Sequence, residues 1–520
     1  MKGAQAILET LHRGGVDTIF ANPGTSEMAL VRALDDVPGV RAVLGLFEGV
    51  VTGAADGYAR MAGRPAATLL HLGPGLANGC ANLHNARRAR TPIVNLIGDH
   101  ATGHLALDAP LTTDVAAVAA PFSCWVQSVA SSGAAGAMAA AALTAARAFG
   151  GPASLIVPAD AAWSEGAAAL DPPSPISPPA PEESRLAAAH AVLSKFGPRT
   201  MLLLGGHALT ERAQQAAARI AAATGARLAS ETFNARAARG RGRPFLPKVP
   251  YFGAAAEAFF GDVDALLRFG ARSPVNFFGY PGRRGVPLRA ESIDLAVAEP
   301  GEDAVVALEA LAGLLAAPPP APPVPPPLPD RPVGPIDART FAAAVARRLT
   351  EGTVLCEEAI TASLGLVDLL AHAAPHDCLE LTGGSIGGSL PLATGAALGA
   401  PGRKVLTLSG DGSALYTVQA LWTQARENLD VTTIICANRS YAILAYEHLQ
   451  IEGRPPGPNA WPVLSLDRPV LDFVQLARGF GVEAVAVDTA EALDDALGAA
   501  MARRGPFLIE ARFAPPAPGA

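Results

Sequence analysis

Short apolar runs alternate along this chain with longer stretches rich in alanine. The apolar runs predict β-strands at 67–71, 92–97, 154–157, 201–204, 405–409 and 431–437. The alanine-rich stretches predict helices at 5–13, 211–223 and 414–428. Strands that are apolar on both faces need helices on both sides, so the alternation predicts an α/β fold of doubly wound parallel sheets. Ligands of such sheets bind beyond the carboxyl ends of the strands.

Two proline-rich stretches, 171–184 and 318–335, divide the chain. Proline cannot sustain the interior of a helix or sheet, and proline-rich segments act as semi-rigid extended spacers. We interpret both stretches as linkers; a ligand for an SH3-type domain is the alternative. The linkers would separate three α/β domains, at 1–170, 185–317 and 336–512.

Composition excludes several classes of protein. Of the 520 residues, 50% are hydrophobic and 17% charged, so the chain can form large cores and is not globally disordered. A formal charge of −7 gives it no general attraction for nucleic acid or an anionic membrane. The five cysteines are scattered without a CxxC pair, which argues against disulfides and thiolate metal sites and favours a reducing cytoplasm.

Neither end of the first domain predicts a membrane segment. Charged residues among the first 13 positions are unlike an apolar export signal. The uncharged segment 125–146 is mostly Ala, Ser and Gly, so we expect a loop and a buried helix there rather than a bilayer span. We therefore expect a soluble, cytoplasmic protein.

The sharpest candidate site follows the strand predicted at 405–409. The chain continues with Gly410, Asp411, Gly412 and Ser413 and then with a helix. Glycines let the backbone approach a bulky anion, and a helix amino terminus offers it free N–H groups. Asp411 supplies a hard oxygen suited to Mg²⁺. A plain Asp-Gly turn is the alternative interpretation.

A second polar loop strengthens this interpretation. Asn438 follows the strand predicted at 431–437 and stands 27 residues after Asp411, about the length of one strand–helix–strand unit. Asp411, the Asn438 amide oxygen and a backbone carbonyl near Ser440 could then hold Mg²⁺ against a diphosphate. On spacing alone, Asn438 could instead be a turn residue.

These loops resemble the thiamine-diphosphate (ThDP) motif of the thiamine-dependent decarboxylase and synthase family, which includes acetolactate synthases and benzoylformate decarboxylases. Ala437 replaces the first of the two asparagines that are usual there. The segment 381–395 (LTGGSIGGSLPLATG) resembles the family segment beneath the cofactor. Segment 356–359 matches its family counterpart poorly, and we assign no site residue there. The resemblance implies a cofactor-binding set of Gly384, Ile386, Gly410, Gly412, Ser413 and Tyr441, and metal ligands Asp411, Asn438 and Ser440.

Within this set, the resemblance gives two residues distinct tasks. The Gly384 carbonyl would accept a hydrogen bond from the aminopyrimidine ring, and Ile386 would hold the cofactor in its bent form. Taken alone, the glycine-rich segment would be a helix-start loop.

Glu48 is the first candidate for a catalytic group. It follows an apolar run, precedes the family-like ADGYAR sequence and could otherwise act only as a helix-capping acid. The resemblance implies that Glu48 hydrogen-bonds N1′ of the aminopyrimidine. A buried carboxylate that shares a proton with N1′ makes the reactive imino tautomer accessible. In the family this glutamate and the diphosphate site come from different subunits, which implies a homodimer or homotetramer with active sites at the subunit interface.

Two further segments, 20–27 (FANPGTSE) and 71–85 (HLGPGLANGCANLHN), resemble the same family branches. Thr25 stands where benzoylformate decarboxylases have an active-site serine, and His71 where they have a histidine that can relay a proton. His84, His100 and His104 are interpreted as structural. Phe277 stands where those enzymes have a second catalytic histidine, which removes one acid–base group.

Taken together, the resemblance implies an enzyme dependent on ThDP and Mg²⁺ that acts on small 2-oxo acids. Decarboxylation would give an enamine that is protonated or captured by a second carbonyl. The alternatives are an FAD-containing acetolactate synthase or oxidase, for which the sequence gives no evidence either way, and a non-catalytic cofactor-binding scaffold. A dehydrogenase is disfavoured because the middle domain lacks a GxGxxG loop. No nucleic-acid or membrane partner is expected.

Overall fold

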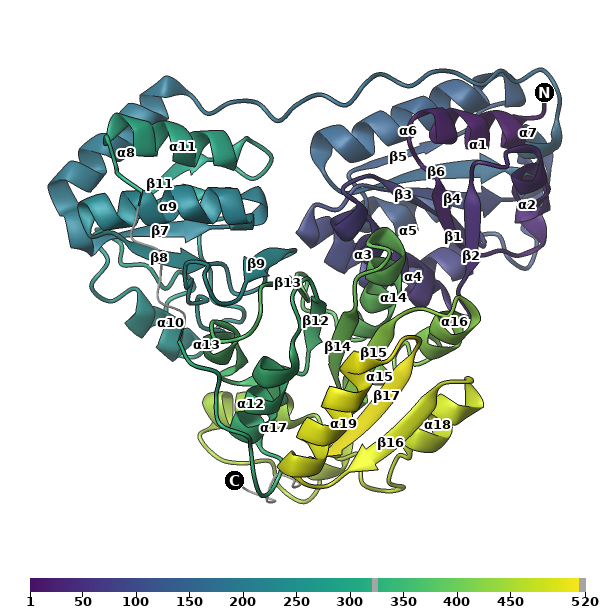
Figure 1. Cartoon of the computed structure of the whole chain (residues 1–520). Helices are drawn as coiled ribbons and strands as arrows, with labels where there is room; N and C mark the ends of the chain where they lie inside the picture. The colour runs from purple at the N-terminus through teal and green to yellow at the C-terminus, as the bar shows by residue number, and fades with distance from the viewer. Residues whose placement is uncertain (320–325, 514–520) are drawn as a thin grey trace.

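The computed structural model describes residues 1–319 and 326–513, which form three units around separate sheets (Figure 1). The N-terminal unit has a six-stranded, fully parallel sheet in the order β2-β1-β3-β4-β6-β5. Its strands are β1 (Thr18–Asn22), β2 (Arg41–Leu44), β3 (Ala66–Leu70), β4 (Ile93–Asp99), β5 (Trp125–Ser128) and β6 (Pro152–Pro158). Its helices are α1 (Gly3–Arg13), α2 (Met28–Ala33), α3 (Glu48–Ala62), α4 (Leu72–Ala89), α5 (Val115–Ala119), α6 (Ala135–Phe149) and α7 (Ala159–Trp163).

Helices cover both faces of this sheet, as its apolar strands require. Neighbouring residues of β1 point to opposite faces: Ile19 packs in a cluster with Leu8 of α1, and Phe20 packs in another with Leu83 of α4. All four side chains are almost completely buried. The doubly wound parallel architecture predicted from the sequence is therefore confirmed for this unit.

The central unit has a four-stranded parallel sheet in the order β11-β10-β7-β8. Its strands are β7 (Thr200–Leu204), β8 (Arg227–Ser230), β10 (Ala265–Phe269) and β11 (Ile293–Ala298). Its helices are α8 (Glu183–Phe196), α9 (Glu211–Thr224), α10 (Gly253–Phe259) and α11 (Ala304–Leu314). Figure 1 shows the extended segment after α7 crossing from the N-terminal unit to α8.

The C-terminal unit has a seven-stranded sheet in the order β16-β17-β15-β14-β12-β13-β9. Its strands are β12 (Val354–Glu358), β13 (His376–Glu380), β14 (Val405–Gly410), β15 (Val431–Ala437), β16 (Glu483–Val487) and β17 (Phe507–Arg512), joined by β9 (Ala237–Arg239) from the middle of the chain. Its helices are α12 (Ala338–Arg348), α13 (Leu366–Leu370), α14 (Ser389–Gly399), α15 (Asp411–Ala414), α16 (Ala420–Arg426), α17 (Ala442–Glu452), α18 (Phe473–Gly479) and α19 (Ala490–Ala502). Only β9 runs antiparallel to its neighbour, which ties the central unit to this sheet.

Two details of the sequence prediction are wrong. The single helix predicted at 414–428 is broken into α15 and α16, and the intervening Thr417 donates its hydroxyl to the Gly387 carbonyl (2.8 Å). The segment 125–146 begins with edge strand β5 and not with a loop, although its second half does form α6. Residues 171–182 contain no helix or strand, and the second proline-rich stretch lies partly outside the described residues, at 320–325. Within the described ranges, no helix is long and apolar enough to cross a bilayer.

Helices α3 and α14 join the N-terminal and C-terminal units, and they lie side by side in Figure 1. A Cβ atom on Gly57 of α3 would lie 1.9 Å from the Leu392 carbonyl oxygen of α14. A Cβ atom on Gly395 of α14 would lie 1.8 Å from the Ala54 carbonyl oxygen of α3. Only glycine permits an approach this close, so these positions fix how the two units pack.

Candidate functional site

Asp411 lies at the carboxyl end of β14, where the next strand of the sheet, β15, also ends. Its side chain is buried, and its two carboxylate oxygens accept the backbone N–H groups of Arg439 (2.6 Å) and Gly412 (2.9 Å). Because the two strands are parallel neighbours, the loops that follow them meet at this edge. The structure thus brings Asp411 beside the loop that holds Asn438, as the sequence spacing suggested.

The electrostatics of this loop fit a divalent cation. Burial raises the pKa of Asp411 to about 6, and the two backbone donors offset that effect only in part. The Asn438 amide oxygen accepts the Ser440 N–H (3.0 Å), and the Ser440 hydroxyl is buried without a hydrogen-bond partner. Carboxylate, amide and hydroxyl or carbonyl oxygens are ligands that Mg²⁺ accepts. The described residues contain no cluster of three or more His, Cys, Asp or Glu side chains suited to a metal.

Close packing surrounds this loop. A Cβ atom on Gly412 would lie 2.3 Å from the Tyr441 ring, so the ring can rest there only because residue 412 is glycine. Ser413 is buried beside Gly412, and Gly410 precedes α15. The Tyr441 ring therefore lies beside the loop that contains Gly410, Asp411, Gly412 and Ser413.

The glycine-rich segment 381–388 lies before α14 and contains Gly384 and Ile386. Gly384 has φ +75°, and a Cβ atom there would lie 2.5 Å from the Phe277 ring. Phe277 belongs to an aromatic group with ring-centroid distances of 5.8 Å to Phe233, 5.1 Å to Tyr251 and 4.8 Å to Phe278. These rings form an apolar wall against the predicted ring-binding glycine, and the Phe277 side chain remains 40% exposed.

Side chains of α4 in the N-terminal unit hold this same segment. Asn85 donates to the Ser385 carbonyl (2.8 Å) and accepts the Ser385 N–H (3.2 Å), and a His84 ring nitrogen lies 3.1 Å from the Gly383 carbonyl oxygen. Asn82 donates to the Gly49 carbonyl (2.8 Å) and, at 3.4 Å, to that of Gly387. These contacts were not predicted from the sequence. Their only sequence signal is the helical spacing of the α4 asparagines at positions 78, 82 and 85.

Glu48 is the first residue of α3 and is buried. Its carboxylate accepts a hydrogen bond from the Asn78 amide (3.0 Å). Glu48 is also an acid in the first turn of this helix, where it interacts favourably with the helix dipole, so both interpretations fit its position. A Cβ atom on Gly75 would lie 2.9 Å from a Glu48 carboxylate oxygen and 3.1 Å from the His71 Cβ atom. Glu48 and His71 therefore both lie close to Gly75.

His71 stands at the N-cap position of α4, immediately before its first residue, and has a buried acidic partner. Its Nδ1 atom lies 2.9 Å from the Glu27 carboxylate, which also accepts the Gly24 N–H (2.7 Å). Glu27 is fully buried, and its second oxygen has no hydrogen-bond partner. A carboxylate that orients an imidazole suits a proton relay. Glu27 was not predicted as a site residue, although an acid three residues after Gly24 has the spacing of a capping box. Thr25, which lies between Gly24 and Glu27 in the chain, is exposed.

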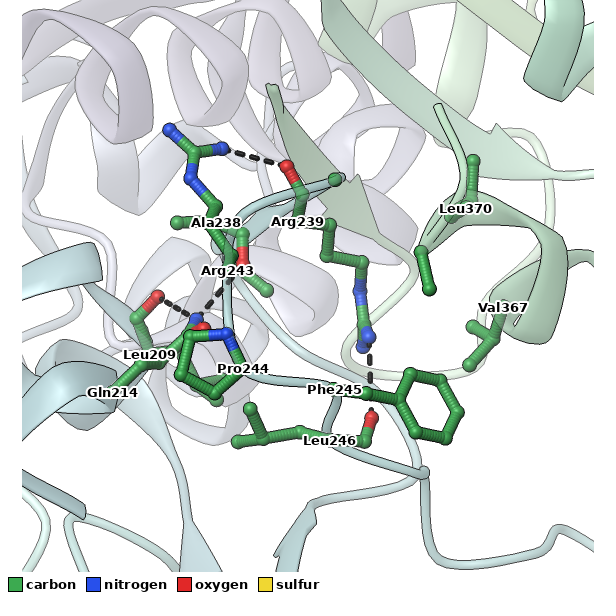
Figure 2. A pocket seen from close by; sticks show the side chains of 13 residues that line it. Leu209, Gln214, Ala238, Arg239, Arg243, Pro244, Phe245, Leu246, Val367 and Leu370 are labelled. Atoms are coloured by element: carbon green, nitrogen blue, oxygen red, sulfur yellow. Dashed lines mark hydrogen bonds between the residues drawn. The ribbon is translucent and has the colours of Figure 1, made fainter. Parts of the chain in front are cut away.

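Figure 2 shows a cavity that none of these residues lines. It lies between the central unit and α13, with Arg239 and Phe245 on one wall and Leu370 on another. Arg239 donates to the Leu246 carbonyl (3.3 Å) along this cavity. A volume of about 20 Å³ admits a water molecule or two and not a coenzyme. This cavity is separate from the candidate site.

Two models of known protein families match the chain. Residues 1–118 match the model of the thiamine pyrophosphate enzyme N-terminal TPP binding domain, and residues 367–511 match that of the C-terminal TPP binding domain. The first range contains Glu48 and His71, and the second contains Gly384, Asp411 and Asn438.

Whole-chain relatives and solved structures give the same result. A Mycobacterium tuberculosis protein named provisionally as an acetolactate synthase large subunit, IlvX, is 48% identical over 511 residues, or 98% of each chain. Benzoylformate decarboxylase of Pseudomonas aeruginosa is 30% identical over 97% of each chain. The structure of a ThDP-dependent 4-hydroxybenzoylformate decarboxylase from Rhodococcus jostii RHA1 superposes with a TM-score of 0.85 at 25% identity, and covers 99% of this chain and 100% of its own.

Proposed function

Because this chain belongs to the thiamine-pyrophosphate-dependent enzyme family, we propose that it binds ThDP with Mg²⁺ and acts on a 2-oxo acid. The observation that carries this proposal is the buried Asp411 carboxylate, which faces the Asn438 loop and has no cationic side chain hydrogen-bonded to it in the described part of the chain. When bound, ThDP supplies the nucleophilic carbon and the electron sink for decarboxylation. Asp411, Asn438 and Ser440 would hold the metal ion.

The remaining residues divide between binding and proton transfer. Gly410, Gly412, Ser413 and Tyr441 would surround the diphosphate, and Gly384 and Ile386 would seat the ring. Glu48 would hold a proton at the ring nitrogen N1′. His71, oriented by Glu27, would move a proton at the reacting carbon, with Thr25 as a hydrogen-bonding neighbour.

The aromatic wall supports a substrate with an apolar or aromatic side chain. Phe277 packs against Gly384, where the aminopyrimidine ring would lie, and Phe233, Tyr251 and Phe278 extend the apolar surface. Two relatives carry names with benzoylformate or 4-hydroxybenzoylformate as substrate. We propose decarboxylation of such a 2-oxo acid to the aldehyde as the first candidate reaction.

Carboligation is the second candidate, and Phe277 favours it. A phenyl ring at this position cannot donate the proton that a histidine would supply, which would disfavour release of the aldehyde relative to capture by a second carbonyl. The name of the 48% identical relative also points to a synthase. A panel of aliphatic and aromatic 2-oxo acids, with CO₂, aldehyde and hydroxyketone measured together, separates the two reactions. Absence of CO₂ from every substrate would favour the non-catalytic scaffold, and bound flavin would favour the FAD-containing alternatives.

Phe277→His is expected to shift the products toward free aldehyde, because an imidazole restores a proton donor beside Gly384. We expect the ratio of aldehyde to hydroxyketone to rise by about 100-fold, at the low end of the contribution of one general acid. Phe278→His, one position along the same aromatic group, is the control and should leave the ratio unchanged. A ratio equal to wild type in both variants would contradict the role given to Phe277.

We also propose that two chains share each active site, with Glu48 from one and Asp411 from the other. Co-expressed Glu48→Gln and Asp411→Ala chains with different tags would form hybrid dimers in which one of two sites is intact. Purified hybrids should then show about half the wild-type activity per dimer, although each parent variant is inactive. If both residues act within one chain, every site of the hybrid is damaged and no activity returns.

A further inference from the structure

Glu358 is a buried carboxylate at the carboxyl end of β12 with no assigned role. Only 1% of the residue is exposed. One carboxylate oxygen accepts the Gly387 N–H (2.5 Å) and the other accepts the Ser389 N–H (2.6 Å). Burial raises its pKa to about 7, and the donors that act on it belong to residues 387–389. In the described part of the chain, no Lys, Arg or His side chain forms an ion pair with it.

Both amides belong to the end of the segment that carries Gly384 and Ile386. The Gly387 peptide is held on both sides, because its carbonyl accepts hydrogen bonds from Thr417 (2.8 Å) and Asn82 (3.4 Å). Gly387 itself has φ +89°, in the left-handed region that glycine adopts far more readily than other residues. Glu358 thus clamps the segment from the sheet while α4 holds it from the N-terminal unit.

A glutamate that served only the start of α14 would need one oxygen and could be partly exposed. Here both oxygens are used and the side chain is buried without a cation, so the Gly387 and Ser389 amides are the hydrogen bonds that offset the cost of its burial. The structure therefore points to a requirement for a fixed backbone at residues 384–388.

We propose that Glu358 is a positioning residue that orders segment 381–388 before ThDP binds, so that the Gly384 carbonyl and the Ile386 side chain are already in place. This inference rests on the proposed function. Ordering the segment in the free protein lowers the entropy lost on binding, which is how preorganisation raises affinity. Glu358 would not touch the cofactor.

Glu358→Gln tests the inference, because glutamine keeps the shape but offers only one acceptor oxygen to the two amides. We expect the dissociation constant for ThDP at saturating Mg²⁺, measured by calorimetry, to rise tenfold or more, as for loss of a hydrogen bond to a charged group. The turnover number at saturating ThDP should change by less than about threefold, because the bound segment reaches the same geometry.

Glu510→Gln is the matched control. Glu510 is also buried in this sheet and accepts a backbone N–H at a helix start, that of Phe473 of α18 (3.2 Å), but does not touch segment 381–388. The Glu510→Gln variant should bind ThDP within about threefold of wild type, because sites that share no interaction partner behave independently. Equal losses in both variants, or wild-type affinity in Glu358→Gln, would overturn the inference.

Hydrogen exchange on the wild-type protein provides a test that does not depend on a folded variant. Peptides that span 384–389 should be protected before ThDP is added, and protection should increase little on binding. Fast exchange in the free protein followed by strong protection would overturn preorganisation. If the wild-type protein binds no ThDP at all, the proposed function fails and this inference fails with it.

Discussion

Replacing Glu48 by glutamine is expected to reduce turnover by about 100-fold to 10,000-fold, the usual contribution of a group that holds or transfers a proton. The carboxylate is buried and accepts only the Asn78 amide in the described structure, so its charge is available to a ligand. Glutamine can still accept that hydrogen bond through its amide oxygen but cannot share a proton with a ring nitrogen. The Glu48→Gln variant should therefore lose turnover and keep the packing around residue 48.

The measurement is CO₂ release from the best substrate of the panel, together with ThDP binding and circular dichroism of the variant. Binding should stay within about tenfold of wild type, because the lost interaction belongs mainly to the transition state. Glu510→Gln, another buried glutamate, should retain full turnover. A Glu48→Gln enzyme with a rate near wild type would refute the assigned role.

The sequence pattern was sufficient for the architecture. Continuous apolar strands that alternate with helices require both faces of a sheet to be covered, which is what Ile19 and Phe20 show on adjacent positions of β1. The same logic placed Asp411 and Asn438 at one sheet edge, because carboxyl ends of neighbouring parallel strands coincide. The first deduction needs only the residues of one strand, and the second needs only one strand–helix–strand unit.

Contacts across long stretches of chain could not be predicted in this way. Asn85 meets Ser385 across 300 positions, and no pattern within either segment encodes that meeting. Strand β9 has only three residues and joins the C-terminal sheet from the middle of the chain, which is too short for periodicity to reveal. The break between α15 and α16 accompanies the Thr417 contact with Gly387, another tertiary effect.

The roles of two buried glutamates could not be predicted from the sequence either. Nothing in the local sequence distinguishes Glu27 and Glu358 from other glutamates. Their roles depend on partners that the fold brings to them, His71 for Glu27 and the Gly387 N–H for Glu358. The segment that contains Glu358 matched its family counterpart poorly, so resemblance did not help. In the structure its two oxygens accept the backbone N–H groups of Gly387, in the glycine-rich segment, and of Ser389, which directly follows it.

Removing the Asp411 carboxylate is expected to have the second largest effect. Asp411→Ala should weaken Mg²⁺-dependent ThDP binding by about 100-fold or more, since loss of a mere outer-shell partner of a metal already costs 10-fold to 100-fold. Asp411 is the one carboxylate in the proposed ligand set. Its backbone hydrogen bonds only partly offset the cost of burying its negative charge, which a bound cation would neutralise. Excess Mg²⁺ should restore little of the affinity.

Asp430→Ala provides the control for this variant. Asp430 precedes β15 in the same sheet and pairs with Lys404 (2.7 Å) rather than with the Asn438 loop. Its removal takes away a carboxylate of the same unit without touching the proposed cation site. Binding of ThDP should therefore remain close to wild type.

Calorimetric titration of ThDP into wild-type and Asp411→Ala protein, each with Mg²⁺ and with a chelator, tests the central claim most directly. We predict saturable binding of one ThDP per chain to the wild type in Mg²⁺ only, and little binding to the variant in either condition. No binding to the wild type in Mg²⁺, or equal binding to both proteins, would contradict a coenzyme site built around Asp411.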